Sequence, residues 1–174
     1  MKNLSIRDWL IGGFAIGLIL AVAYMWLSPA GIQPAPEFKG NALNMKRSID
    51  LAQLKGKPVL VTFWATSCPG CIKEMPHLIE LYQELQPKGF EIVSIAMSYD
   101  RPDHILNMAK KKQIPYPIIY DGTKSAAKAF GDVSLTPTSF LINPAGQIVR
   151  HKVGEMDMKL LHAQIVTMLN KNKG

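Results

Sequence analysis

The sequence predicts an α/β domain, in which helices flank a central mixed sheet, behind one N-terminal transmembrane helix. From residue 58 onward, apolar β-branched runs alternate with helical patterns, which is the order of a parallel sheet. The last two runs are joined by Asn143-Pro144-Ala145-Gly146 and read as an antiparallel hairpin. With 174 residues, 48% of them hydrophobic, the chain is long enough for one domain with a core and an appended segment.

The appended segment is an uncharged, mostly apolar stretch over residues 9–27. This length just spans a bilayer as a helix. Lys2 and Arg7 precede it, which favours a cytoplasmic N-terminus at residues 1–8 and export of the rest. A cleaved signal peptide is the alternative, because small residues at Ala21-Val22-Ala23 and at Ser28-Pro29-Ala30 offer cleavage sites.

The linker is predicted over residues 28–36, where three prolines and a glycine occur without apolar periodicity. The domain is predicted to occupy residues 37–174. Its expected strands are residues 58–64, 90–97, 117–120, 138–143 and 147–152. Its expected helices are a turn at 50–54, a helix from 68 to 85, and helices at 102–113, 124–130 and 157–170.

Two cysteines, Cys68 and Cys71, stand where the first strand meets the following helix. Unpaired N–H groups and the positive end of the helix dipole stabilise a thiolate there, so Cys68 is the expected nucleophile. Cys71 lies about one turn further, within disulfide distance but turned toward the protein, and is the expected resolving thiol. Pro69 suits the first helical position, which needs no N–H.

Other uses of a Cys-x-x-Cys pair are less well supported. A zinc site needs further ligands, but there is no third cysteine, and the four histidines are scattered singly. Haem attachment requires histidine after the second cysteine, where Ile72 stands. A purely structural disulfide remains open as an alternative.

Several motifs in order resemble the thioredoxin superfamily, and within it the membrane-anchored TlpA/ResA-like thiol–disulfide oxidoreductases. The motifs are residues 63–71 (FWATSCPGC) with Glu74-Met75-Pro76, residues 54–58 (LKGKP) before the strand, and residues 135–146 (LTPTSFLINPAG). The resemblance covers roughly residues 37–169. It implies a thioredoxin-like fold in which residues 97–121 form an inserted β/α unit.

The resemblance also implies roles for individual residues. Pro137 is expected to follow a cis peptide bond and to pack against the active-site disulfide. The backbone of Thr136 is expected to pair with an extended substrate segment. Further substrate contacts are expected from Trp64, Pro69 and Gly70.

The chain departs from the family pattern at two positions. Thioredoxins proper carry a buried acid where this chain has Thr62, so the proton acceptor for Cys71 is expected to be Asp100, with Asp103 as second choice; either could instead only cap a helix. Ser67 replaces an aromatic residue beside Cys68. Glu74 matches the family motif, but its spacing suggests the helix surface and a salt-bridge role.

The predicted function is that of an extracytoplasmic thiol–disulfide oxidoreductase, most simply a reductase of client proteins in cytochrome c or metal-centre maturation. It needs no dissociable cofactor, because the Cys68–Cys71 pair is the redox group. The expected partners are clients with cysteines or disulfides, a membrane-embedded electron donor, and the bacterial cytoplasmic membrane, with the domain facing the periplasm or cell exterior.

Two rival functions remain open. A thiol peroxidase would reduce hydroperoxides directly, and a copper chaperone would bind metal through Cys68 and Cys71, with Met97 or Met108 as soft ligands. The net charge is +7, but the basic residues do not alternate with aromatic ones. No nucleic-acid partner is therefore expected.

Overall fold

The computed structural model describes Gly13 and residues 16–19 and 33–171. The chain divides into two units, residues 1–32 and residues 33–174. In the first unit, Gly13 and residues 16–19 are helical; the predicted cytoplasmic segment 1–8, most of the predicted span and residues 28–32 of the predicted linker lie outside the described residues. Within the described part of the chain, no helix has both the length and the apolar character required to cross a bilayer.

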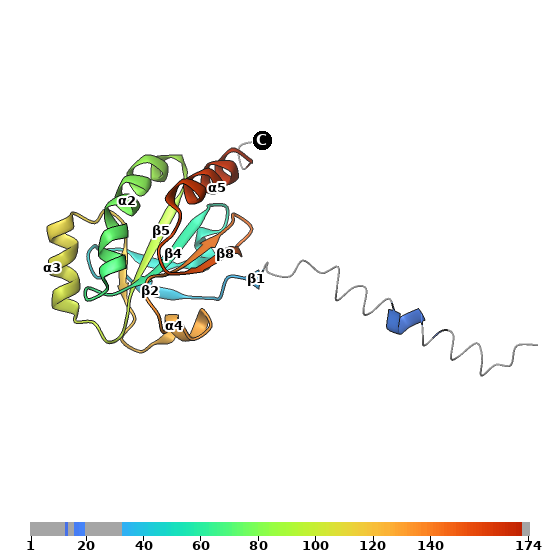
Figure 1. Ribbon diagram of the computed structural model, residues 1–174, viewed down its shortest axis with the longest axis horizontal. Helices are drawn as coiled ribbons and strands as arrows, with labels where there is room; N and C mark the ends of the chain where they lie inside the picture. Colours follow the sequence, from blue (N-terminus) through green and yellow to red (C-terminus); the bar gives the residue numbers. More distant parts are fainter. Residues whose placement is uncertain (1–12, 14–15, 20–32, 172–174) are drawn as a thin grey trace, which may run out of the picture. The chain divides into compact units, whose positions relative to one another are not determined.

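The second unit is built on a mixed sheet of six strands in the order β1-β8-β7-β4-β5-β6 (Figure 1); the mixed sheet is as predicted, with β1 as an additional strand. Its central strand β4 pairs in parallel with β5 and antiparallel with β7. The strands are β1 (Gln33–Pro34), β4 (Val59–Trp64), β5 (Glu91–Ala96), β6 (Ile118–Tyr120), β7 (Thr138–Ile142) and β8 (Gln147–Val153). Because β4 and β5 are buried at every residue, both faces of the sheet must be covered.

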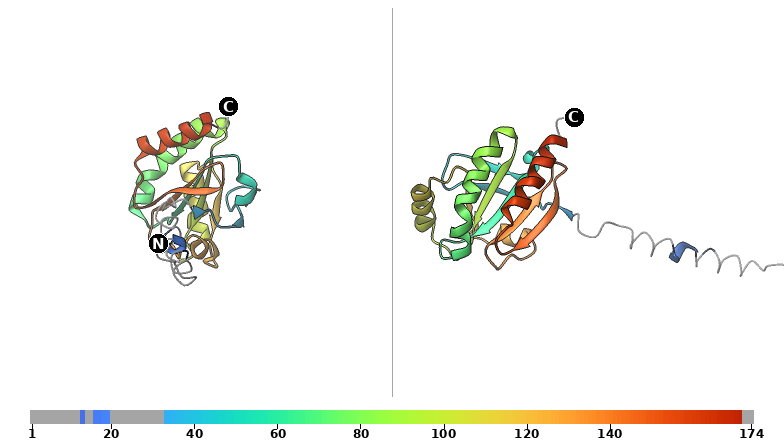
Figure 2. Two further views of the ribbon diagram at one scale, coloured as in Figure 1. Left: turned by 90° about the vertical axis from the view of Figure 1, so that its right-hand side faces the viewer. Right: turned by 45° about the horizontal axis from the view of Figure 1, so that its top comes forward.

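Helices cover the two faces unequally. Figures 1 and 2 show α2 and α5 side by side on one face, where with α3 they pack on Leu60, Ile92 and Leu141. The opposite face, with Val61 and Phe63, is covered by α4 and by the segment before β4. The helices are α2 (Pro69–Leu85), α3 (Pro102–Lys112), α4 (Ser125–Ala129) and α5 (Met158–Lys171), with a 3-10 turn η2 (Gln86–Lys88) after α2.

The domain begins earlier than predicted. Strand β1 pairs with β8, and the Ala35 N–H donates to the Gly146 carbonyl at 2.8 Å, so residues 33–36 belong to the domain and not to the linker. The proline content of this segment hides the strand. Pro34 is tolerated because β1 is an edge strand.

A small hairpin, β2 (Lys39–Asn41) with β3 (Ser48–Asp50), is also absent from the sequence prediction. Its strands are too short to show an alternating pattern. The predicted turn that follows is confirmed as a 3-10 helix η1 (Leu51–Leu54), which begins where the Asp50 side chain accepts from the Ala52 N–H at 3.0 Å.

Candidate active site

Cys68 and Cys71 form a disulfide at the start of α2, with their Cα atoms 5.3 Å apart. Cys68 is the N-cap of the helix, and its Sγ accepts the Cys71 N–H at 3.2 Å. Pro69 follows at the first helical position, where a missing N–H is harmless. The predicted strand-to-helix placement of both cysteines is therefore confirmed, and a helix N–H points at the sulfur expected to act as nucleophile.

The loop before β7 lies against this helix start. The Thr136–Pro137 peptide bond is cis, as the resemblance implies. A methyl group added to Gly70 would lie 3.5 Å from Pro137 Cδ, so Gly70 and the proline are in close contact. The Pro137 carbonyl accepts the Gly154 N–H at 2.8 Å, whereas among residues 33–171 the Thr136 backbone N–H and C=O make no hydrogen bond.

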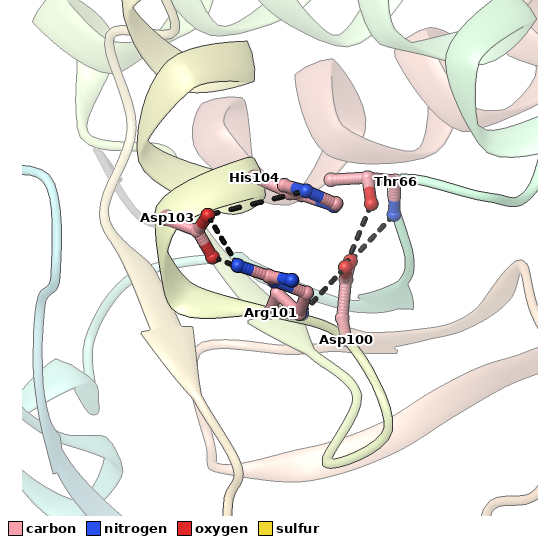
Figure 3. A network of polar contacts seen from close by, with 5 residues as sticks. All are labelled: Thr66, Asp100, Arg101, Asp103 and His104. Carbon is pink, nitrogen blue, oxygen red and sulfur yellow. Dashed lines mark hydrogen bonds and ion pairs between the residues drawn. The ribbon is translucent and has the colours of Figure 1, made fainter.

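Asp100 bonds to the loop before Cys68. Its Oδ2 accepts the Thr66 N–H at 2.6 Å, and its Oδ1 accepts the Thr66 hydroxyl at 2.7 Å and the Arg101 N–H at 2.8 Å (Figure 3). These bonds occupy both oxygens and tie the turn after β5 to the loop before Cys68. These contacts give Asp100 a positioning role, and none of the described contacts joins it to Cys71, so its role as proton acceptor for Cys71 stays a prediction.

Asp103, the second choice, faces solvent. It forms a bidentate pair with Arg101 at 3.0 and 3.1 Å, which lowers the pKa of its carboxyl group (Figure 3). It therefore stabilises the start of α3 and does not reach the cysteines.

The acid beside Cys71 is Glu74. Its side chain is 4% exposed and lines a small cavity together with Cys71, Tyr116 and Pro137. The cavity has about 10 Å³ available to the centre of a water molecule, which is close to the minimum for one water. Glu74 Oε1 accepts the Met156 N–H at 2.8 Å.

Burial is the largest cause of a raised pKa at Glu74, and the Met156 N–H partly offsets it. The predicted surface position of Glu74 is wrong, because the chain just before α5 covers this part of α2. The sequence spacing could have predicted this burial. Glu74 is three residues after Cys71, so both lie on the same buried face of the helix.

Two further residues complete the interior of the site. Thr62, at the position of the thioredoxin acid, is 3% exposed, and its hydroxyl accepts from Ser139 at 2.9 Å. Trp64 is also 3% exposed and lines the same cavity as Cys71, with its Nε1–H lacking a partner among the described residues. The expected direct substrate contact of Trp64 is therefore not supported, whereas Pro69 is exposed and Gly70 is half-buried.

Across residues 13, 16–19 and 33–171, no three or more side chains of His, Cys, Asp and Glu lie together in a way that could hold an ion.

Comparison with known proteins shows to which family a chain with this site belongs. Residues 31–169 match the family model Redoxin. The chain belongs to the Redoxin family. It is 36% identical over 128 residues to the thiol-disulfide oxidoreductase ResA of Bacillus subtilis (strain 168), a match covering 74% of this chain and 70% of the relative. The same-named protein of Bacillus thuringiensis subsp. konkukian (strain 97-27) is 38% identical over 128 residues, covering 73% and 72%.

Two solved structures with thioredoxin names also resemble this chain in fold. A thiol:disulfide interchange protein of the thioredoxin family from Chlorobium tepidum TLS superposes with a TM-score of 0.73 at 29% identity, covering 82% of this chain and 99% of that one. A putative thioredoxin from Neisseria meningitidis gives 0.72 at 33% identity, covering 79% and 91%. The predicted thioredoxin-like fold and ResA-like resemblance are confirmed, and thiol–disulfide oxidoreductase is the enzyme class to which they lead.

Proposed function

We propose that this Redoxin-family enzyme reduces disulfides in client proteins outside the cytoplasm, while its N-terminal segment holds it in the cytoplasmic membrane. The observation that carries the proposal is the position of Cys68: its sulfur caps α2 and accepts the Cys71 N–H, and Gly70, two residues further on, contacts Pro137, which follows the unpaired backbone of Thr136. A helix N-terminus lowers a thiol pKa, so Cys68 is the thiol that ionises first in the reduced enzyme.

The first step joins the client to the enzyme. An extended client segment pairs with the free N–H and C=O of Thr136, as an added strand does. The Cys68 thiolate attacks one sulfur of the client disulfide, and the other client sulfur departs as a thiolate. The product is a mixed disulfide between Cys68 and the client.

The second step releases the client. Cys71 is 4% exposed in apolar surroundings, which raise the pKa of a thiol, so it needs a base. Glu74 lines the same cavity, and its raised pKa brings it nearer to that of a thiol, which makes it the better acceptor. The Cys71 thiolate then attacks Cys68 Sγ, and the client leaves with both of its sulfurs reduced.

Two electrons thereby move from the enzyme to the client, and the Cys68–Cys71 disulfide must be reduced again. Outside the cytoplasm this requires an electron donor in the membrane, within reach of a tethered domain. Clients of the kind expected are apocytochromes and copper-centre apoproteins, whose cysteines must be reduced before they bind their cofactors.

Trapping the client tests the proposal. Cys71→Ser cannot resolve the mixed disulfide, so it should accumulate covalent complexes with client proteins on the outer side of the membrane. Cys68→Ser is the matched control and should accumulate none. Equal trapping by both variants, or by neither, would contradict the assignment of Cys68 as nucleophile.

A further inference from the structure

Exposed apolar side chains gather around the loop that carries Thr136 and Pro137. Between residues 33 and 171, five large apolar side chains are exposed, and three of them lie at this loop. Leu135 is 63% exposed, Tyr99 58% and Val153 47%. They come from three separate elements: the loop itself, the turn after β5 and the end of β8. We call Tyr99, Leu135 and Val153 the loop patch.

Contacts fix the loop patch around Thr136. The Tyr99 hydroxyl lies 3.4 Å from the Thr136 hydroxyl, and Leu135 precedes Thr136 in the chain. Val153 lies opposite Thr138 in the sheet, beside Gly154, which donates to the Pro137 carbonyl. Apolar side chains thus gather around Thr136, whose backbone N–H and C=O are unpaired within residues 33–171.

The turn that carries Tyr99 is held firmly. Its next residue, Asp100, bonds the Thr66 N–H and hydroxyl, so the turn joins the cysteine loop to the loop patch. A surface groove of about 490 Å³ continues from Tyr99 and is lined by Val133 and Ser134, the residues just before Leu135, and by the charged residues Lys124, Lys128 and Asp132. The loop patch therefore borders a groove of mixed apolar and charged lining, with room for further residues of an extended segment.

We propose that the loop patch selects client segments with apolar side chains two residues before and two residues after the reactive cysteine. In an extended segment, side chains two positions apart point to the same side. When the client cysteine faces Cys68, the side chains at these two positions therefore face the protein, beside the loop patch. Clustered exposed apolar side chains of this kind mark interaction sites. The inference deepens the proposed function and rests on it.

Three capped heptapeptides with a central cysteine test this, each used as a symmetric disulfide dimer. One carries leucine two positions from the cysteine on both sides, the second carries the same leucines at the adjacent positions, and the third has serine in their place. The reduced enzyme converts each dimer to two peptide thiols and itself forms the Cys68–Cys71 disulfide. The rate of that conversion is measured by acid quench and mass spectrometry.

We expect the first peptide to be reduced at least about fivefold faster than the serine peptide, the effect of partly burying leucine side chains. It should also be faster than the second peptide, which has the same composition. Tyr99→Ser and Leu135→Ser should reduce this preference to less than about twofold. Leu160→Ser, which removes an exposed leucine from α5, is the matched control and should keep it.

Equal rates for all three peptides would overturn the inference while leaving the reductase function intact. A preference that survives both patch variants, or a faster second peptide, would overturn it as well. If no dimer is reduced, the proposed function itself fails. A concentration-dependent dimer of the enzyme that Tyr99→Ser abolishes would show instead that the loop patch binds a second copy of the chain.

Discussion

Replacement of Glu74 by glutamine separates the two chemical steps. The amide oxygen of Gln can still accept the Met156 N–H at the position of Oε1, so the packing of α2 against the segment before α5 is retained. What is lost is the ability to take a proton from Cys71. The variant therefore tests one chemical property at a buried position.

The expected size of the effect follows from the thiol. A free cysteine with a pKa of about 8.5 is about 3% thiolate at pH 7. Burial of Cys71 lowers this fraction further. Without an acceptor, the second step should slow by about 30-fold or more at pH 7, approaching the roughly 100-fold at the lower end of general-base catalysis, and should recover by up to about tenfold per pH unit as the pH rises.

A dinitrobenzoate disulfide provides the assay, because the reduced enzyme releases two coloured thiolates in sequence. The first reports the attack by Cys68 and the second the resolution by Cys71. Glu74→Gln should slow only the second. Glu84→Gln is the matched control, since Glu84 is an exposed acid of the same helix paired with Lys88, and should leave both steps nearly unchanged.

Stability provides an independent readout with a defined sign. The pKa of Glu74 is raised in the folded protein, so the wild type loses stability relative to Glu74→Gln as the pH rises from the ordinary glutamate range through the raised value. If Glu74→Gln carried out the second step at the wild-type rate and with the wild-type pH profile, the proton-acceptor role of Glu74 would be refuted. Equal slowing of both steps would indicate a structural defect instead.

Three further predictions concern other parts of the site and fold. In the reduced enzyme, Cys68 should be alkylated first, with a pKa below about 8.5, and Cys71 much more slowly. Asp100→Asn should lower the free energy of unfolding by about 1–2 kcal/mol and slow both thiol steps by similar factors, because it weakens charge-assisted bonds to the loop before Cys68. Arg47→Met should cost about 2 kcal/mol in urea unfolding, because it leaves the buried Glu91 carboxylate without its ion pair.

Each of these three predictions has a control variant or a result that would contradict it. Equal labelling of the two cysteines would contradict the first prediction. Asp103→Asn changes an exposed acid and should leave both thiol steps unchanged; slowing confined to resolution in Asp100→Asn would support the predicted role of Asp100 as proton acceptor. Lys39→Met breaks an ion pair whose lysine is solvent-exposed and should leave the free energy of unfolding nearly unchanged; an equally small effect in Arg47→Met would refute the argument from burial.

The sequence predicts the sheet because its central strands are long apolar runs, and it predicts the cysteines because the motif sits at a strand-to-helix junction. It misses β1 and the β2–β3 hairpin, whose two or three residues are too short for any periodicity. Those elements are defined by pairing partners that are remote in the chain, which a local pattern does not contain.

The acids of the site illustrate the same limit. Asp100 stands at the expected position in the chain, but the direction of its side chain depends on Thr66, which precedes it by 34 residues. Glu74 is charged and so reads as a surface residue, although the segment before α5 buries it. Helix phase alone, counted from Cys71, would have placed it correctly.

The reduction potential of the Cys68–Cys71 pair tests most directly whether the enzyme donates or withdraws electrons. Equilibration of the purified domain with glutathione buffers, followed by alkylation, measures it. A client reductase should have a midpoint near the roughly −270 mV of thioredoxin and be found reduced in growing cells. A value near the roughly −120 mV of the strong periplasmic oxidant, with the enzyme fully oxidised in cells, would contradict the proposal and make the protein a disulfide donor.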